Sequence, residues 1–393
     1  MNSEVYVAAA VRTPMGRFGG AFKDLGPAEL AAPVMRAAVD RAQLDPARLD
    51  LVIFGQVLGG GHGQLVPRQA ARRAGLPDQV DALALDMVCS SGMVSIMTAC
   101  AYIRAGMARV VLAGGMESMS QAGFALSSRA RWGYRYVPGP GRHVTDLLYR
   151  DGLSDPVTGE AMGVQAEKLA AEAGATRMEM DRIATESHKR AHAAAEGHRF
   201  TSEIVPVETR KGYMTCDEGI RPDTTAEALQ ALRPAFTQDG VLTAGNSSQI
   251  SDGAAALLLA GRSTVDDYGL VPLARVRGAA VSAGEWWRFM EAPAEASRRA
   301  LRQCGVETAD IDLFENNEAF ALSTLLYKRQ LRLPGDKLNV HGGAIALGHP
   351  IGCSGARIVV TLLHALKTRD QALGLAALCH GTGGGTALVV ERC

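Results

Sequence analysis

The sequence lacks any imbalance of charge. Its 393 residues include 41 basic and 41 acidic side chains, so the formal net charge at pH 7 is zero. A chain without excess positive charge has no overall field that attracts nucleic acid or an anionic membrane. The composition therefore favours a small ligand, and we expect no nucleic-acid partner.

Long apolar runs are also missing. The run GAAALLLA at 253–260 is far shorter than the roughly 20 residues that a helix needs to cross a bilayer. The first residues do not combine a basic segment with an apolar one, as a secretion signal would. We therefore expect a cytoplasmic protein that does not associate with membranes.

Cysteine is sparse, with seven residues, at 89, 100, 216, 304, 353, 379 and 393. An odd number without framework spacing predicts reduced thiols rather than disulfides. His349 and Cys353 resemble a pair of metal ligands, but no second pair has ligand spacing, so we expect no metal site. The role of each cysteine has to come from its context.

An internal repeat divides the chain. The segment AVDRAQLDPARLDLVIFGQ (38–56) aligns without a gap with ALRQCGVETADIDLFENNE (300–318), at an offset of 262 residues. The helical patterns that begin at SSG (90–92) and CSG (353–355) align at an offset of 263. Two separate matches at nearly the same offset indicate two copies of one α/β unit related by pseudo-twofold symmetry.

Within each copy, apolar runs rich in β-formers alternate with helical patterns, which predicts parallel strands covered by helices, with ligands bound at the carboxyl ends of the strands. The expected strands are LVIFGQV, ALDMV and RVVLAGG, and the expected helices cover 27–43, 91–105 and 351–368. We predict an N-terminal half over 1–120 with a return strand near 250–265, an inserted loop domain over 121–250 with helices at 161–173 and 178–196, and a C-terminal half over 266–393.

Cys89 follows the run ALDMV and precedes a predicted helix. Ser90 and Ser91 are typical helix caps, and the free N–H groups and dipole of that helix would point at the sulfur. This position favours the thiolate, which is the nucleophilic form of cysteine. A purely structural thiol is the alternative, and a nearby base would decide between them.

His349 is the candidate base. It lies in HGGAIALGHPIGCSG (341–355), the part of the second copy that corresponds to the Cys89 turn, and Pro350 suits the first position of a helix. The symmetry would bring His349 opposite Cys89. His341 lacks this placement, and we expect it to be structural.

Two further segments end strands on the same predicted face, namely ENNEAFA (315–321) and LCHGTGGGTA (378–387). The second contains Cys379 and glycines that allow a close approach of the backbone. GTGGGT is not followed by the lysine of a P-loop, which argues against a nucleoside triphosphate. Its amide groups are suited instead to an oxyanion hole.

Together these segments, with AGGMESMS (113–120) and TAGNSSQISDGAAA (243–256), resemble the thiolase family of acetyl-CoA acyltransferases over the whole chain. The resemblance implies the five-layered αβαβα thiolase fold, two pseudo-symmetric halves with an inserted loop domain. It also implies acetyl-CoA, 3-ketoacyl-CoA and coenzyme A as substrates, no resident cofactor, and a homodimer or homotetramer.

The resemblance assigns roles to particular residues. Cys89 is similar to the nucleophile that accepts the acyl group, His349 to its base, and Cys379 to the second acid/base. Asn317, through an ordered water in the family, resembles part of one oxyanion site together with His349, while the N–H groups of Cys89 and Gly381 resemble the other. Two oxyanions and two exchangeable protons match the needs of a ping-pong cycle.

The resemblance also implies residues that bind coenzyme A. Ser248 would lie beside the pantetheine arm, and Arg221 of GIRPDTT would lie near the nucleotide. The stretch RARWGYRYVPGPGRH (129–143) is basic and aromatic, and we interpret it as a solvated or tetramer-forming loop, with a contribution to phosphate binding as the alternative.

The chain departs from the family pattern at three places. Asp86 replaces a common asparagine and would oppose thiolate formation at Cys89, unless it points away and caps the backbone. Ala161 replaces the histidine usual in short-chain members. RFMEAP (288–293), preceded by two tryptophans, replaces a glycine-containing stretch, and those bulky residues would reshape the acyl pocket, cover the nucleotide, or simply pack.

We therefore predict an acyl-CoA C-acyltransferase of fatty acid metabolism, with acetyl-CoA C-acetyltransferase as the leading activity. A degradative thiolase of β-oxidation, acting on longer chains, is the close alternative. An inactive homologue that binds lipid-CoA is a further alternative, but it would have little reason to keep Cys89, His349 and Cys379 together. A papain-like hydrolase would not need Cys379.

Overall fold

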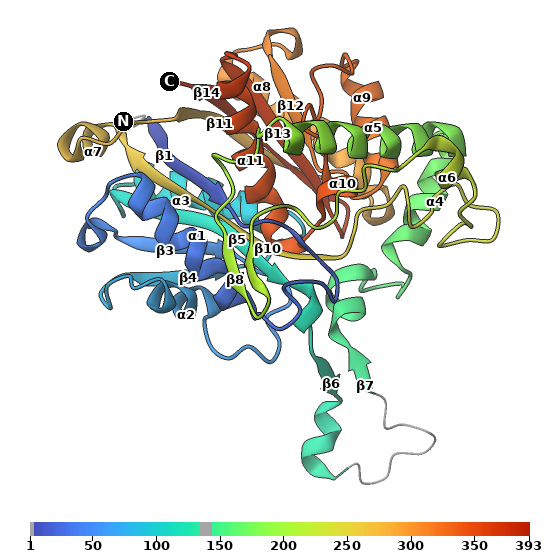
Figure 1. Cartoon of the computed structure of the whole chain (residues 1–393), viewed down its shortest axis with the longest axis horizontal. Helices are drawn as coiled ribbons and strands as arrows, with labels where there is room; N and C mark the ends of the chain where they lie inside the picture. The colour runs from blue at the N-terminus through green and yellow to red at the C-terminus, as the bar shows by residue number, and fades with distance from the viewer. Residues whose placement is uncertain (1–3, 134–143) are drawn as a thin grey trace.

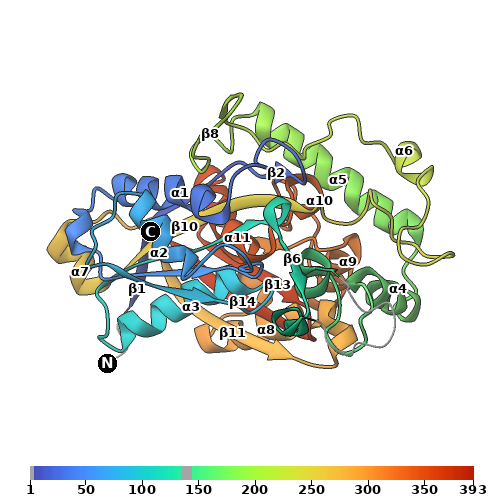
Figure 2. The same ribbon diagram turned by 90° about the horizontal axis from the view of Figure 1, so that it is seen from below.

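A computed structural model describes residues 4–133 and 144–393, and ten of its strands form one continuous sheet, with two separate two-stranded sheets outside it (Figures 1 and 2). The N-terminal half has the order β1-β10-β5-β3-β4, and the C-terminal half has the order β11-β14-β13-β12, which matches it except that β4 has no counterpart among the described strands. The halves join where β1 pairs antiparallel with β11, through Val5 opposite Val276. The strand order thus repeats as the internal sequence repeat predicts.

The strand bounds are β1 Val5–Arg12, β3 Leu51–Gly55, β4 Asp81–Leu85, β5 Val110–Ser118, β10 Ser251–Gly261, β11 Ala274–Ala283, β12 Leu313–Asn316, β13 Leu373–His380 and β14 Gly384–Arg392, with the short β2 Gly16–Arg17 pairing to β10. In β10 every residue is buried. This strand is sequestered on both faces because helices cover the sheet on both sides, and its sequence SDGAAALLLAG is accordingly almost uninterruptedly apolar.

Helices complete five layers. On the outer side of the N-terminal half lie α1 (Pro27–Arg41) and α2 (Val66–Arg73), and on the outer side of the C-terminal half lie α8 (Ala292–Cys304) and α9 (Ala321–Leu331). Between the halves lie α3 (Ser91–Arg104) and α11 (Ile351–Thr368), which share one core with both (Figure 1). The predicted αβαβα fold is confirmed.

The positions of the helices explain their sequences. α11 is buried around its whole circumference, as expected for a helix between two sheet halves. α8 has a sheet on one side only, and its other side carries Glu295 with exposed arginines. All five predicted helices form, within a few residues of their expected bounds, which were 27–43, 91–105, 161–173, 178–196 and 351–368.

The segment between β5 and β10 contains α4 (Met162–Glu172), α5 (Arg177–Glu196), α6 (Ala226–Gln230) and two hairpins, β6 (Phe124–Leu126) with β7 (Val144–Asp146) and β8 (Val207–Thr209) with β9 (Gly212–Met214). The β6–β7 hairpin extends away from the body as an arm (Figure 1). Residues 134–143 of the predicted basic loop lie outside the described residues. Two short helices complete the described chain, α7 (Arg262–Tyr268) and α10 (Ala344–Leu347). Among the described residues, none of the helices combines the length and apolar character that crossing a membrane requires.

The central helices α3 and α11 cross with their backbones in contact. A Cβ atom added to Gly92 would lie 2.8 Å from the backbone nitrogen of Ala356 and 2.9 Å from the carbonyl oxygen of Gly352. A Cβ atom on Gly355, the equivalent residue of the second copy, would meet the backbone of Met93. Both residues must be glycine because no flexible side chain is available to yield.

Replacing Gly92 with alanine is expected to force these helices apart. We expect the free energy of unfolding to fall by roughly 1–3 kcal/mol, as for other overpacked interiors. Gly284→Ala is the matched control, because no atom lies within 4 Å of its added Cβ and its backbone is not left-handed. Chemical denaturation should find Gly284→Ala within about 0.5 kcal/mol of the unaltered chain. Equal stability of the two variants would contradict the close contact.

Candidate active site

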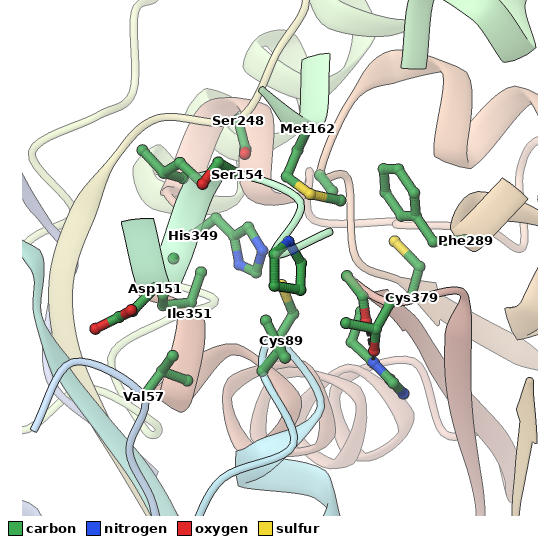
Figure 3. A pocket seen from close by; sticks show the side chains of 18 of the residues that line it. Val57, Cys89, Asp151, Ser154, Met162, Ser248, Phe289, His349, Ile351 and Cys379 are labelled. Atoms are coloured by element: carbon green, nitrogen blue, oxygen red, sulfur yellow. Dashed lines mark hydrogen bonds between the residues drawn. The ribbon is translucent and has the colours of Figure 1, made fainter. Parts of the chain in front are cut away.

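A cavity of about 370 Å³ opens between the two halves, at the carboxyl ends of the central strands. Cys89, His349 and Cys379 all line it, although they come from different halves and from three separate segments. Figure 3 shows their side chains facing the same space, with Phe289 on the side of Cys379 and Val57 on the opposite side. The structure therefore brings together the three residues that the sequence singled out for chemistry.

A strained turn presents Cys89. Strand β4 ends at Leu85, three residues earlier than predicted, and Val88 adopts a left-handed conformation with φ of 48°. This conformation is costly for a β-branched residue. The Ser91 hydroxyl holds the turn, because it accepts from Met87 N–H at 2.8 Å and donates to the Val88 carbonyl at 2.6 Å.

The predicted capping of α3 by Ser90 and Ser91 is wrong. Ser90 occupies the N-cap position, but its side chain makes no capping hydrogen bond. Its hydroxyl instead lies 3.0 Å from that of Thr386 in the other half. The serines therefore hold the turn and the contact between halves instead of the helix end.

The expected stabilisation of the Cys89 thiolate is also wrong. Burial raises the pKa of the Cys89 thiol to about 12, and the nearby carboxylates of Glu117 and Asp86 add to the rise. The backbone N–H groups of Gly381 and of Cys89 itself approach the sulfur and oppose the rise, but they do not outweigh burial. Cys89 is therefore a neutral thiol in the resting site and needs a base to become a nucleophile.

Hydrogen bonds determine which nitrogen of His349 is the base. Ser354 Oγ lies 2.5 Å from His349 Nδ1 and donates its own proton to the Pro350 carbonyl at 2.8 Å. A hydroxyl has a single proton, so Ser354 must accept from Nδ1–H. This arrangement leaves the lone pair on Nε2, as a base requires. Pro350 is the N-cap of α11, whereas the sequence analysis placed it at the first position of the helix, which is Ile351.

The imidazole is neutral as well. Burial, followed by the positive charge of Arg357, lowers the pKa of His349 to about 3. A thiol with a raised pKa beside an imidazole with a lowered pKa rests as a neutral pair, in contrast to a thiolate–imidazolium ion pair. Proton transfer from Cys89 to His349 therefore has to accompany the attack on the substrate.

Cys379 lies at the end of β13 and is buried. Burial, with a smaller contribution from Cys89, raises the pKa of its thiol to about 12. A weak acid that holds its proton in the resting state is suited to protonating a strongly basic carbanion. This property fits the predicted role of Cys379 as the second acid/base.

Asn317 follows β12 and is fully buried. Its Nδ2 lies 3.4 Å from each ring nitrogen of His349. It is not among the residues that line the cavity, so it reaches the site from behind His349. Asn317 and His349 therefore lie next to each other, as predicted.

The remaining predicted residues divide into two groups. Gly381 and Ser248 line the cavity. Arg221 does not: its side chain is exposed, and its backbone N–H donates to His188 Nδ1 at 3.1 Å. The structure places Arg221 outside this cavity, so a role toward the nucleotide of coenzyme A stays a prediction.

Several residues that the sequence reasoning missed form the apolar wall of the cavity, namely Val57, Leu153, Met162, Phe320 and Ile351. Phe289 of the RFMEAP segment, for which an effect on the acyl pocket was one alternative, completes this wall. Glu117 was missed as well. It is fully buried at the end of β5, and its carboxylate accepts from the N–H groups of Val57 at 3.0 Å, Leu58 at 3.1 Å and Gly352 at 2.9 Å. It thereby ties the start of α11 to the cavity wall across the two halves. Its occurrence within AGGMESMS was the available signal.

Asp86 caps the backbone, as one alternative proposed, and it also lies in the cavity near Cys89, as the other proposed. Its Oδ1 accepts from Val88 N–H at 2.9 Å, so it caps the strained turn, and it also lines the cavity. Burial is the main cause of its raised pKa, which the nearby His380 opposes. The Asp86 carboxyl group, which the sequence analysis expected near Cys89, thus lies close to His380 of the other half.

The tryptophans that precede RFMEAP pack away from the cavity. Trp287 lies under Lys168 Nζ, 4.2 Å from the ring centroid, and donates to Glu285 at 3.0 Å. Trp286 is half-exposed, and Phe289 is the residue of this segment that reaches the cavity. Packing therefore accounts for Trp287. The described residues contain no group of three or more His, Cys, Asp or Glu side chains arranged to hold a metal ion.

The chain is similar over its whole length to known proteins of one family. Residues 5–263 match the model of the thiolase N-terminal domain, and residues 270–392 match that of the thiolase C-terminal domain. An acetyl-CoA acetyltransferase of Synechocystis is 57% identical over 99% of both chains, and one of Escherichia coli is 46% identical over 98% of both.

Two solved structures superpose over nearly the whole chain. The crystal structure of an acetyl-CoA acetyltransferase from Bacillus anthracis has a TM-score of 0.96 and 42% identity, with full coverage of both chains. A thiolase from Ascaris suum, solved in complex with coenzyme A, has a TM-score of 0.93 and 38% identity, with 99% of this chain and 100% of that chain covered.

The neutral resting pair predicts how Cys89 reacts with an alkylating agent. Because the pKa of its thiol is raised to about 12, the thiolate fraction is small at pH 7 and grows as pH rises. The rate of iodoacetamide modification of Cys89, followed by mass spectrometry, should therefore climb continuously from pH 6 to pH 10. A plateau already reached below pH 7, as an ion pair would give, would contradict the neutral site.

Proposed function

This chain belongs to the thiolase family, and we propose that it is an acetyl-CoA C-acetyltransferase that joins two molecules of acetyl-CoA and, in reverse, cleaves 3-ketoacyl-CoA with coenzyme A. The observation that carries the proposal is the shared cavity of Cys89, His349 and Cys379, which holds a nucleophile, a base and a second acid. The named activity of full-length relatives at 46% and 57% identity supports the same reaction.

Thiolysis begins with the transfer of the Cys89 proton to Nε2 of His349. The sulfur attacks the 3-keto carbon, and the bond between C2 and C3 breaks. Cys379 gives its proton to the carbanion at C2, so that acetyl-CoA leaves and a thioester remains on Cys89. At this point Cys379 is a thiolate and His349 is protonated.

Coenzyme A then completes the cycle. Its thiol gives a proton to the Cys379 thiolate, and its sulfur attacks the thioester carbon. Cys89 leaves as a thiolate and takes back the proton from His349, which restores both neutral groups. Run in reverse, Cys379 removes the α-proton of acetyl-CoA, and the resulting enolate attacks the acetyl group on Cys89.

Each negatively charged oxygen has its own donors. The N–H groups of Cys89 and Gly381 converge on the sulfur of Cys89, and we assign to them the tetrahedral oxygen formed there. Asn317 and His349 are assigned to the enolate oxygen. Both sets are preorganised in a buried site, which strengthens their interaction with charge.

We also propose how the substrate lies and how the protein assembles. Ser248 lies at the cavity beside the pantetheine arm, with Arg221 toward the nucleotide, and the enzyme works without a resident cofactor or metal. A homodimer or homotetramer is supported by exposed apolar residues of the arm, Phe124, Leu126, Trp132 and Val144. We place the enzyme in the cytoplasm, in fatty acid metabolism.

The covalent intermediate provides a direct test. After exposure to acetyl-CoA, mass spectrometry should find one acetyl group on Cys89, and Cys89→Ala should remove it. The exposed Cys216 and Cys393 are internal controls, because non-specific acetylation would modify accessible thiols. Acetylation of these residues without Cys89 would refute the mechanism.

One observation favours the alternative of a longer acyl chain. The cavity is largely apolar, and Ala161 does not supply the polar side chain usual in short-chain members. Steady-state kinetics over 3-ketoacyl-CoA substrates of increasing length should give the highest kcat/KM at the four-carbon substrate. A maximum at six or more carbons would replace the acetyltransferase assignment with that of a degradative thiolase.

A further inference from the structure

A buried arginine stands behind the proposed oxyanion site. Arg357 lies on α11, and no part of it is exposed. Its closest carboxylate is Glu315, whose Oε2 lies 3.8 Å from Nη1, too far for a hydrogen bond. Among the described residues, Nε and Nη1 have no hydrogen-bond partner, and neither has either carboxylate oxygen of Glu315.

Arg12 shows how different a tightly paired buried arginine looks. It is equally buried, but it donates to Glu203 at 2.6 Å and to Asp217 at 2.6 and 2.9 Å. A buried charge without such partners reduces stability, because the lost hydration is not replaced. The loose pairing of Arg357 therefore calls for a role other than folding.

The contact that Arg357 does make leads to the reaction. Its Nη2 lies 3.5 Å from Oδ1 of Asn317, whose Nδ2 in turn lies 3.4 Å from His349. A guanidinium has donors only, so it attracts the amide oxygen of Asn317 and repels the amide NH₂. The amide is thereby turned with its N–H groups toward His349, where a donor is needed.

We propose that Arg357 is a positioning residue for the carbon–carbon bond step: it fixes the amide orientation of Asn317 and places positive charge behind the enolate oxygen. This inference rests on the proposed function. It assigns to Arg357 no contact with substrate, since Asn317 and His349 lie between them.

Other charged and titratable groups around Arg357 fit this role. They are Glu315 from β12, Glu318 from the segment after β12, Arg12 from β1, Cys353 from α11 and Glu203 from the segment after α5. Burial raises the pKa of Glu315 to about 8, and the attraction of Arg357 only partly offsets it. The carboxyl group is thus largely protonated at neutral pH, which leaves the positive charge of Arg357 incompletely neutralised. Arg357 also contributes, after burial, to the lowered pKa of His349.

The two oxyanion sites make the inference testable. Acetyl transfer between coenzyme A and Cys89 uses the N–H groups of Cys89 and Gly381, and condensation also needs the enolate held by Asn317 and His349. Loss of a positioning group behind the second site should slow condensation and spare acetyl transfer. General damage to the structure would slow both.

The experiment compares Arg357→Met and Arg357→Lys with the unaltered enzyme, measuring condensation of acetyl-CoA and exchange of labelled coenzyme A into acetyl-CoA. For Arg357→Met we expect condensation to fall roughly 10- to 100-fold, with exchange and the KM for acetyl-CoA within about threefold. This loss is smaller than the roughly 100- to 1,000-fold that a lost oxyanion donor costs, because Arg357 acts through Asn317. The acidic limb of the condensation pH profile should move to higher pH, because the pKa of His349 rises when the positive charge is removed.

Arg357→Lys keeps the charge and loses the planar fork, so it should recover the pH profile and only part of the condensation rate. It also provides a test if the methionine variant does not fold. Arg12→Lys is the matched buried control, for which any loss should affect condensation and exchange equally. Equal losses in both reactions, or unchanged condensation, in the Arg357 variants would overturn the inference. Absence of both reactions in the unaltered enzyme would instead refute the proposed function.

Discussion

The site depends on the contact between the backbones of α3 and α11. Gly92 and Gly355 occupy equivalent positions in the two copies, and each faces the other helix without a side chain. This contact brings the starts of both helices together, and Cys89 and His349 precede those starts by a few residues. A larger spacing between the helices would separate the nucleophile from its base, even if the turns that hold Cys89 and His349 kept their conformations. The carboxylate of Glu117 secures the same junction, because it binds backbone N–H groups from both halves.

The electrostatics of the cavity follow from its burial. Both thiols have raised pKa values and the imidazole has a lowered one, and in each case loss of hydration is the largest cause. The resting site therefore contains no separated charges among its three reacting groups. Charge arises only when substrate is present, next to amide groups and a buried guanidinium that are already in place. Such a site protects its thiols from adventitious reaction while remaining responsive to a bound thioester.

The sequence was sufficient for the architecture because the repeat and the alternation of apolar and helical patterns are long-range signals. The helices over 27–43 and 351–368 formed as predicted, and symmetry placed His349 opposite Cys89. The local details failed for physical reasons. The left-handed backbone of Val88 contradicts its own propensity and is held by Ser91, a tertiary constraint that no propensity reveals. The direction of the Cys89 pKa shift was also wrong, because a helix start can be recognised in a sequence whereas the depth of burial cannot. The apolar wall is drawn from distant segments, so it became visible only in three dimensions.

The repeat also shows how the two halves differ at equivalent places. With an offset of 263 residues, Asp86 occupies the place of His349, and Glu117 that of His380. Equivalent places in the two halves thus carry an acid on one side and an imidazole on the other, although Asp86 follows strand β4 and His349 follows helix α10. At the same offset Cys89 corresponds to Gly352, so the nucleophile and the base do not occupy equivalent positions. The two halves therefore contribute different groups to one cavity: the first supplies the nucleophile, and the second supplies the base and the second thiol.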